Sequence, residues 1–231
     1  PLAVRSSSLL EDALDHPFAG VYGTKMIPNN QIDEDQRFQA LCAAIRFVYA
    51  ATYLKTAQDY FDGSGRDHAA EKMAVILQEV VGDRHGDRYY PVMSGVARSF
   101  NYYPSGAAKP TDGVVNLALG LGRQIVDGGL SWGYSPAYPA APPPFADVGD
   151  RMRSTQTTFW SVNMGTPPPP DPMRETEYLE RTDLEVAAAD GVLDHLVSTY
   201  DPRSDRLRMG CAGVGPRVLD FARSWWVRPY R

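Results

Sequence analysis

An arginine at the end of a short apolar stretch is the first residue whose surroundings suggest chemistry. Arg5 follows Leu2 to Val4 and precedes Ser6-Ser7-Ser8. A guanidinium is a rigid fork of donors that suits a phosphate, and serine hydroxyls and backbone N–H groups beside it extend such a cradle. The alternative is an ion pair between Arg5 and Glu11 or Asp12. From the residues alone, the two interpretations stand level.

Two other segments carry ligand-binding potential. Residues 18–24 read Phe-Ala-Gly-Val-Tyr-Gly-Thr, and Gly20 and Gly23 let a backbone approach a ligand closely. A β-turn is the simpler interpretation. Gln78 and Glu79, followed by Val80, interrupt an apolar run. Such a strand can present a backbone carbonyl and N–H to an adenine edge, although an outward-facing polar pair explains the pattern equally well.

Common catalytic and metal motifs are missing from the sequence. No Gly-Lys-Ser or Gly-Lys-Thr of a Walker motif occurs, nor any HExxH, CxxC or GxSxG. The four histidines, at positions 16, 68, 85 and 195, lack metal-ligand spacing, and two cysteines cannot close a zinc site. We therefore expect no metal ligands within this chain.

Composition indicates an ordinary soluble protein. Of 231 residues, 23 are Lys or Arg and 28 are Asp or Glu, giving a net charge of −5, and 43% are hydrophobic. The acidic balance argues against a nucleic-acid partner, and no apolar run is long enough to cross a membrane. The chain lacks a signal-peptide pattern, so we expect a cytoplasmic protein. Because Pro1 opens directly on apolar residues, we also expect a piece of a longer chain.

Hydrophobic spacing predicts an α+β fold with mainly antiparallel sheets and flanking helices. We expect no internal repeat and one domain fragment over residues 1–231, with proline-rich surface connections at 131–144 and 167–170. The expected elements are a strand at 2–5, a helix at 33–60, a hairpin of strands at 73–81 and 89–101, a strand at 114–121 and a short helix at 123–127.

Several short motifs, taken in their order along the chain, resemble those of the ATP-binding domain of the phosphoenolpyruvate (PEP) synthase and pyruvate phosphate dikinase family. This domain is also called the PEP/pyruvate-binding domain. The series covers residues 1 to about 130, and each motif gains weight from its place in it. The matching segments are Val4–Ser8, Glu11-Asp12 and Phe18–Gly20 for VRSSA…ED…FAG, 73–81 for AVxVQ-x-MV, Ser94–Ala97 for SGVxFT, and Leu119–Gly122 with Val126 and Gly128-Gly129 for GLGExVVxG.

The resemblance implies an incomplete ATP-grasp domain that holds ATP. Arg5 would take the catalytic and ATP-binding role at the phosphates, beside Ser6. Gly20 and Thr24 would form a loop over the phosphates. The adenine-lining residues would be Gln78, Glu79 and Val80. The implied cofactors are ATP and magnesium, with the metal ligands outside this chain.

The same resemblance implies a function for a larger protein. The family's phosphotransferases phosphorylate a carrier histidine from ATP and then phosphorylate pyruvate. This chain lacks the upstream lysine lobe and the Glu…Leu-Gln-x-Arg pattern, and Asn101–Pro104 departs from the usual segment. Alone it should be inactive, with the parent chain's other domains as partners. The alternatives are a dikinase-type enzyme with another acceptor, or a non-catalytic nucleotide-binding or interaction module. Trp225-Trp226 would pack on a missing lobe or in a homodimer, or belong to the core.

Overall fold

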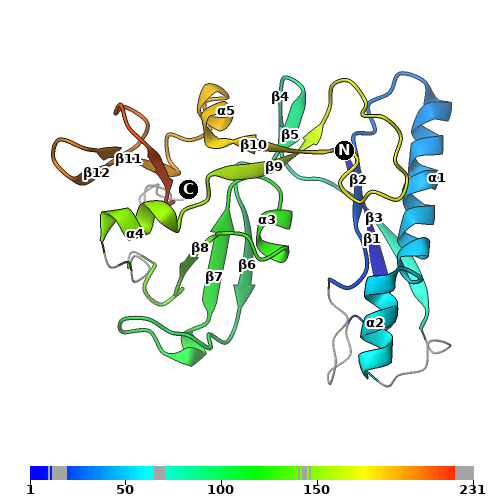
Figure 1. Cartoon of the computed structure of the whole chain (residues 1–231), viewed down its shortest axis with the longest axis horizontal. Helices are drawn as coiled ribbons and strands as arrows, with labels where there is room; N and C mark the ends of the chain where they lie inside the picture. Colours follow the sequence, from blue (N-terminus) through cyan, green and yellow to red (C-terminus); the bar gives the residue numbers. More distant parts are fainter. Residues whose placement is uncertain are drawn as a thin grey trace, which may run out of the picture. The chain divides into compact units, whose positions relative to one another are not determined.

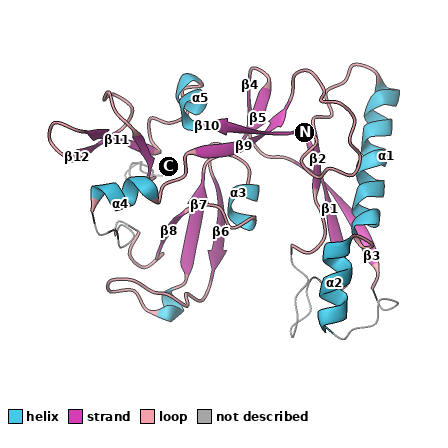
Figure 2. Ribbon diagram, viewed as in Figure 1, coloured by secondary structure: helices cyan, strands magenta, loops and turns pink. Residues whose placement is uncertain are grey.

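The structure is a computed structural model that describes residues 1–9, 11, 20–64, 71–139, 141, 145 and 147–221 (Figures 1 and 2). Trp225-Trp226 therefore falls outside the described residues. The described part of the chain divides into two compact units. Unit 1 comprises Pro1–Tyr89 and Val162–Glu180, and unit 2 comprises Tyr90–Ser161 with the described residues from Arg181 onward. Strands β9 (Thr158–Asn163) and β10 (Leu179–Asp183) each run from one unit into the other.

Unit 1 is built on a three-stranded antiparallel sheet. Strand β1 (Leu2–Ser8) lies in the centre, between β2 (Lys25–Ile27) and β3 (Met73–Glu79). Helix α1 (Glu34–Ala51) packs on one face of this sheet, as Figure 1 shows in blue. The buried cluster between sheet and helix consists of Val4, Ile27, Ala44, Phe47 and Val48.

The predicted helix at 33–60 is two helices, α1 and α2 (Lys55–Ser64). At its start, the Asp33 side chain accepts from the Asp35 N–H at 2.9 Å, as an N-cap should. At its end, the N–H groups of Tyr53 and Leu54 bond three residues back, to Ala50 and Ala51. This tighter turn ends the regular helix, and the apolar spacing on either side does not reveal it.

The predicted hairpin of 73–81 with 89–101 is wrong. Strand β3 pairs instead with β1, and β6 (Ser94–Arg98) pairs with β7 (Val114–Ala118). The charged segment between the predicted strands folds into its own small hairpin, β4 (Asp83–His85) and β5 (Arg88–Tyr90). Gly86 supplies the positive φ of 61° that its tight turn requires. The charged segment therefore does contain a turn, but this turn closes a shorter hairpin than expected.

Unit 2 contains two further antiparallel sheets. One has the order β6-β7-β8, with β8 at Trp132–Tyr134. The other has the order β12-β11-β13, formed by Arg206–Met209, Val197–Asp201 and Arg217–Leu219. Its helices are α3 (Arg123–Val126), α4 (Val148–Arg153) and α5 (Leu184–Ala189), with a 3₁₀ turn at Pro110–Asp112. The α+β class with antiparallel sheets is thus confirmed.

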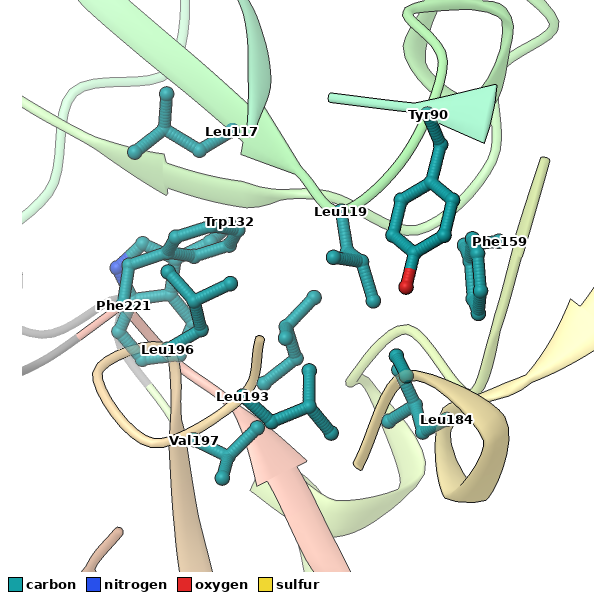
Figure 3. Close-up of a cluster of buried hydrophobic side chains, with 12 residues drawn as sticks. Tyr90, Leu117, Leu119, Trp132, Phe159, Leu184, Leu193, Leu196, Val197 and Phe221 are labelled. Atoms are coloured by element: carbon teal, nitrogen blue, oxygen red, sulfur yellow. The ribbon is translucent and has the colours of Figure 1, made fainter. Parts of the chain in front are cut away.

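The core of unit 2 gathers side chains from these two sheets, from α5, and from β5 and β9, which belong to a four-stranded sheet of order β10-β9-β5-β4 (Figure 3). Tyr90 is fully buried, its ring centroid lies 4.7 Å from that of Phe159, and its hydroxyl donates to Asp190 at 2.7 Å. The members of this cluster are Tyr90, Leu117, Leu119, Trp132, Phe159, Leu184, Ala187, Leu193, Leu196, Val197, Leu219 and Phe221.

The Gly-Leu-Gly turn after β7 is fixed by the backbone around it. Gly120 has a φ of +79°, and a Cβ there would lie 2.6 Å from the Trp160 carbonyl oxygen. The Leu121 N–H donates to that same oxygen at 3.0 Å. The buried Gln156 amide bonds both the N–H and the C=O of Leu119, each at 2.9 Å. Glycine is therefore required at position 120 for close packing.

Candidate functional site

Arg5 and Gln78 meet on the face of the unit 1 sheet opposite α1. Side chains alternate between the faces of a strand, so Val4 packs towards α1 and Arg5 projects the other way. In the register, Ala3 lies opposite Gln78, and Arg5 lies opposite Ile76. The Arg5 Nη1 donates to the Gln78 Oε1 at 3.2 Å, and both side chains are exposed. Two of the predicted site residues, 73 positions apart, are thus brought together.

The suggested ion pair of Arg5 with Glu11 is replaced by a local serine network. The Glu11 carboxylate accepts from the Ser6 hydroxyl at 2.6 Å and from the Ser8 N–H at 2.8 Å. In return, the Glu11 N–H donates to the Ser8 Oγ at 3.2 Å. Asp12 lies outside the described residues. Ser6 therefore helps to shape the turn after β1, and its contact with ATP stays a prediction.

The loop before β2 carries Gly20 and Thr24. Gly20 is exposed, has a φ of +78°, and has open space where a Cβ would be. Gly23 serves packing instead, since a Cβ there would lie 2.7 Å from the Phe47 ring. The Thr24 N–H donates to the Glu175 Oε1 at 3.1 Å. Within the described residues, an acidic side chain thus already accepts from the backbone of this predicted phosphate loop.

The predicted adenine-lining segment lies at the end of an edge strand. The Val80 N–H donates to the Pro1 carbonyl at 3.1 Å, and the Val80 carbonyl accepts from the Tyr89 hydroxyl at 3.0 Å. Because hydrogen-bonded and non-bonded pairs alternate in an antiparallel ladder, the Leu2–Glu79 pair is a non-bonded one. The backbone N–H and C=O of Glu79 therefore point away from β1. In the described sheet, they face its free edge.

Lys25 forms a buried ion pair that the sequence analysis did not single out. Its Nζ lies 2.6 Å from a Glu177 carboxylate oxygen, and the two side chains are 1% and 5% exposed. The ammonium also donates to the carbonyls of Pro172 at 2.8 Å and Asp171 at 3.2 Å. It lies 5.2 Å from the centroid of the Phe47 ring. A lysine within a short apolar strand was the only available signal, and it does not name its partner.

These contacts hold an acidic segment, which we call the strap (residues 164–178), against the rest of unit 1. The Asn30 amide donates to the Met164 carbonyl at 2.8 Å at one end. Near the other end, Glu177 pairs with Lys25 of β2, and its carboxylate also accepts from the Asp171 N–H within the strap at 2.9 Å. The proline run 167–170 lies between them and is largely exposed, as the sequence predicted. The strap is thus extended but anchored.

Tyr22 adds a buried polar contact near the same loop. Its hydroxyl donates to the Glu71 carboxylate at 2.7 Å, and its ring packs with Ala57 and Phe61. Burial raises the pKa of the Tyr22 hydroxyl, and the hydrogen bond to Glu71 raises it further. Tyr22 is therefore a proton donor in a structural contact rather than a proton acceptor.

The described residues offer no ready magnesium site. Among them, no group of three or more His, Cys, Asp or Glu side chains is arranged to hold a metal ion. Likewise, none of the described helices is both long and apolar enough to span a membrane. Magnesium ligation by residues outside this chain stays a prediction.

A separate cavity of about 380 Å³ lies within unit 2. It contains none of the predicted site residues, and its lining carries no charged side chain, which does not suit a phosphate. The lining residues are Ser105, Gly106, Ala107, Ala108, Gly133, Tyr134, Ser135, Tyr138, Ala141 and Phe145.

Comparison with known protein families indicates the class of ligand for these residues. Residues 1–135, more than half of the chain, match the family described as the AMP/ATP-binding domain of pyruvate phosphate dikinase. The chain belongs to this family. It therefore belongs with the ATP-binding portions of dikinase-type kinases and phosphotransferases, and its α+β fold is consistent with an ATP-grasp-like domain. A comparison with curated proteins found no match.

Proposed function

We propose that this chain is the ATP-binding portion of a phosphotransferase of the PEP synthase and pyruvate phosphate dikinase type. The parent enzyme would phosphorylate a carrier histidine from ATP and then phosphorylate pyruvate. One observation carries the proposal beyond family membership. Arg5 is an exposed arginine on the open face of the β2-β1-β3 sheet, in contact with Gln78 of the edge strand.

Each residue of the proposed site has a physical task. The Arg5 guanidinium holds ATP phosphates by charge-assisted hydrogen bonds. The side chain of Ser6 lies on the other face of β1, so we propose that Ser6 acts on the site by shaping the turn through its bond to Glu11. Gly20 and Thr24 cover the phosphates, since the open space at Gly20 admits a close approach of the backbone. The adenine lies along the end of β3. There Glu79 offers a backbone donor and acceptor at the free edge, beside the side chain of Gln78 and the buried Val80.

Residues 1–231 would form one ATP-grasp-type fragment of a larger cytoplasmic enzyme. Mg²⁺ would be held by residues outside this chain. Its partners would be ATP and the parent chain's upstream and downstream domains, with a homodimer as a further proposal. Phosphoryl transfer depends on metal and positioning. The chain alone should therefore bind ATP but transfer no phosphoryl group.

We propose that a lysine, a second arginine and the metal ligands of the full site lie in other parts of the parent protein, and we expect a low affinity for this chain for that reason. A charge-assisted hydrogen bond contributes about 1.5–3 kcal/mol. Loss of about three such contacts, from the lysine, the second arginine and the metal ligands, weakens binding by roughly a thousandfold or more. We therefore expect a dissociation constant in the millimolar range.

Calorimetric titration of the full chain with Mg-ATP tests the proposal. Wild type should show saturable binding, and Arg5→Ala should weaken it. Arg46→Ala is the matched control, because Arg46 is an exposed arginine on α1 outside the proposed site. Equal losses from both substitutions would mean that only overall charge matters. Absence of wild-type binding into the millimolar range would contradict the proposed ATP-binding role.

A further inference from the structure

The Thr24 N–H, placed at the phosphates by the proposed function, already has an anionic acceptor. The Glu175 Oε1 lies 3.1 Å from the Thr24 nitrogen, although the two residues are 151 positions apart. Carboxylate and phosphate oxygens accept the same kind of hydrogen bond from a backbone N–H. One N–H donates well to only one acceptor at a time. An incoming phosphate and Glu175 therefore require the same donor.

The strap holds Glu175 in this position by a buried clamp. Lys25, next to Thr24, pairs with Glu177, only two residues beyond Glu175. The same ammonium donates to the Asp171 and Pro172 carbonyls. Both sides of the contact are thus fixed, since β2 carries Lys25 and the strap carries Glu177. The contact is built into unit 1 and is not a chance meeting of two surface side chains.

The charge of Glu175 matters because the site is only partly exposed. Its side chain is half-buried, so solvent screens the carboxylate less than at a fully exposed position. A polyphosphate that approaches Thr24 meets this negative charge as well as an occupied donor. Both effects oppose the binding of an anion and leave the binding of a neutral ligand unaffected.

We infer that Glu175 competes with nucleotide phosphate for the Thr24 N–H and so weakens the binding of phosphate at this loop. The inference rests on the proposed function. It predicts a change in phosphate affinity opposite to the change that a purely structural role of Glu175 predicts. If Glu175 only stabilised the loop, its removal would loosen the loop and weaken phosphate binding. If Glu175 competes, its removal frees the donor and tightens phosphate binding.

The test uses the full chain, with inorganic pyrophosphate, ATP and adenosine as probes. Glu175→Ala removes the acceptor, and Glu175→Gln removes the charge while preserving shape. Glu34→Gln is the control, since it makes the same change in net charge at an exposed carboxylate on α1. Dissociation constants come from calorimetry, and the Thr24 amide is followed by NMR.

Glu175→Ala should bind pyrophosphate and ATP about fivefold or more tightly than wild type. Glu175→Gln should shift affinity in the same direction by less, and adenosine binding should not change. Glu34→Gln should stay within about twofold of wild type. Thermal unfolding shows whether Glu175→Ala folds, and where it does not, the isosteric Glu175→Gln decides.

Two outcomes overturn the inference in distinguishable ways. If wild type binds ATP and both Glu175 variants bind pyrophosphate equally or more weakly, Glu175 is structural and the proposed function stands. If neither wild type nor the variants bind ATP or pyrophosphate, the proposed function fails and the inference fails with it.

Discussion

Replacing Lys25 by methionine should destabilise unit 1 strongly. Methionine preserves most of the apolar stem beside Phe47, so the substitution removes charge and hydrogen bonds rather than volume. It leaves the Glu177 carboxylate, 5% exposed, without its 2.6 Å partner, and it takes a donor from the Asp171 and Pro172 carbonyls. Breaking a buried ion pair on one side costs about 3–5 kcal/mol.

Thermal unfolding and hydrogen exchange measure this loss. A cost of this size corresponds to a fall in Tm of about 6–20 °C for a chain of this length. Because the chain has two units, hydrogen exchange by mass spectrometry assigns the loss. Peptides from β2 and the strap should lose protection, and those from β11 to β13 should retain it.

Two further variants separate the ion pair from general effects of charge. Lys55→Met breaks an exposed pair with Asp59, whose side chains are 86% and 59% exposed, and should cost at most about 0.5 kcal/mol. The double variant Lys25→Met/Glu177→Leu should regain much of the lost stability, since no buried charge is left unpaired. A Lys25→Met variant no less stable than Lys55→Met would refute the reasoning.

Two other predictions concern local structure. Gly120→Ala should lower the free energy of unfolding by about 2–4 kcal/mol in chemical denaturation, because the new Cβ would lie 2.6 Å from the Trp160 carbonyl and φ is +79°; Gly128→Ala, with a φ of +75° but open space, should cost less. The raised pKa of Tyr22 favours its protonated form in the folded state. Its contribution is therefore fully present below about pH 10 and is lost as pH rises through the folded pKa. Alkaline unfolding of Tyr22→Phe should show a shallower pH dependence than wild type, and identical slopes would contradict the assignment.

Local patterns predicted much of what lies close together in the sequence. The helical spacing after Asp33 located α1, the apolar stretch before Arg5 located β1, and the ordered motifs indicated the family that residues 1–135 match. Such features depend on neighbouring residues, which a single sequence displays directly. The confirmed antiparallel α+β class follows from the same patterns.

Partners distant in the sequence could not be predicted. The contact of Arg5 with Gln78 depends on β1 pairing with β3, whereas the sequence suggested that β3 pairs with the strand after it. Lys25 and Glu177 each look like ordinary charged residues until the fold buries them together. The alternating pattern that reveals a strand says nothing about which strand lies beside it.

The central claim, that ATP binds on the Arg5 face of the unit 1 sheet, is tested most directly by site-resolved NMR. Amide shifts of the isotopically labelled full chain would be followed during titration with Mg-ATP, for wild type and for Arg5→Ala. We predict saturable shifts at Arg5, Thr24 and the Glu79–Val81 segment, displaced to higher ATP concentration in Arg5→Ala. Shifts confined to other residues, or an identical titration in Arg5→Ala, would contradict this account.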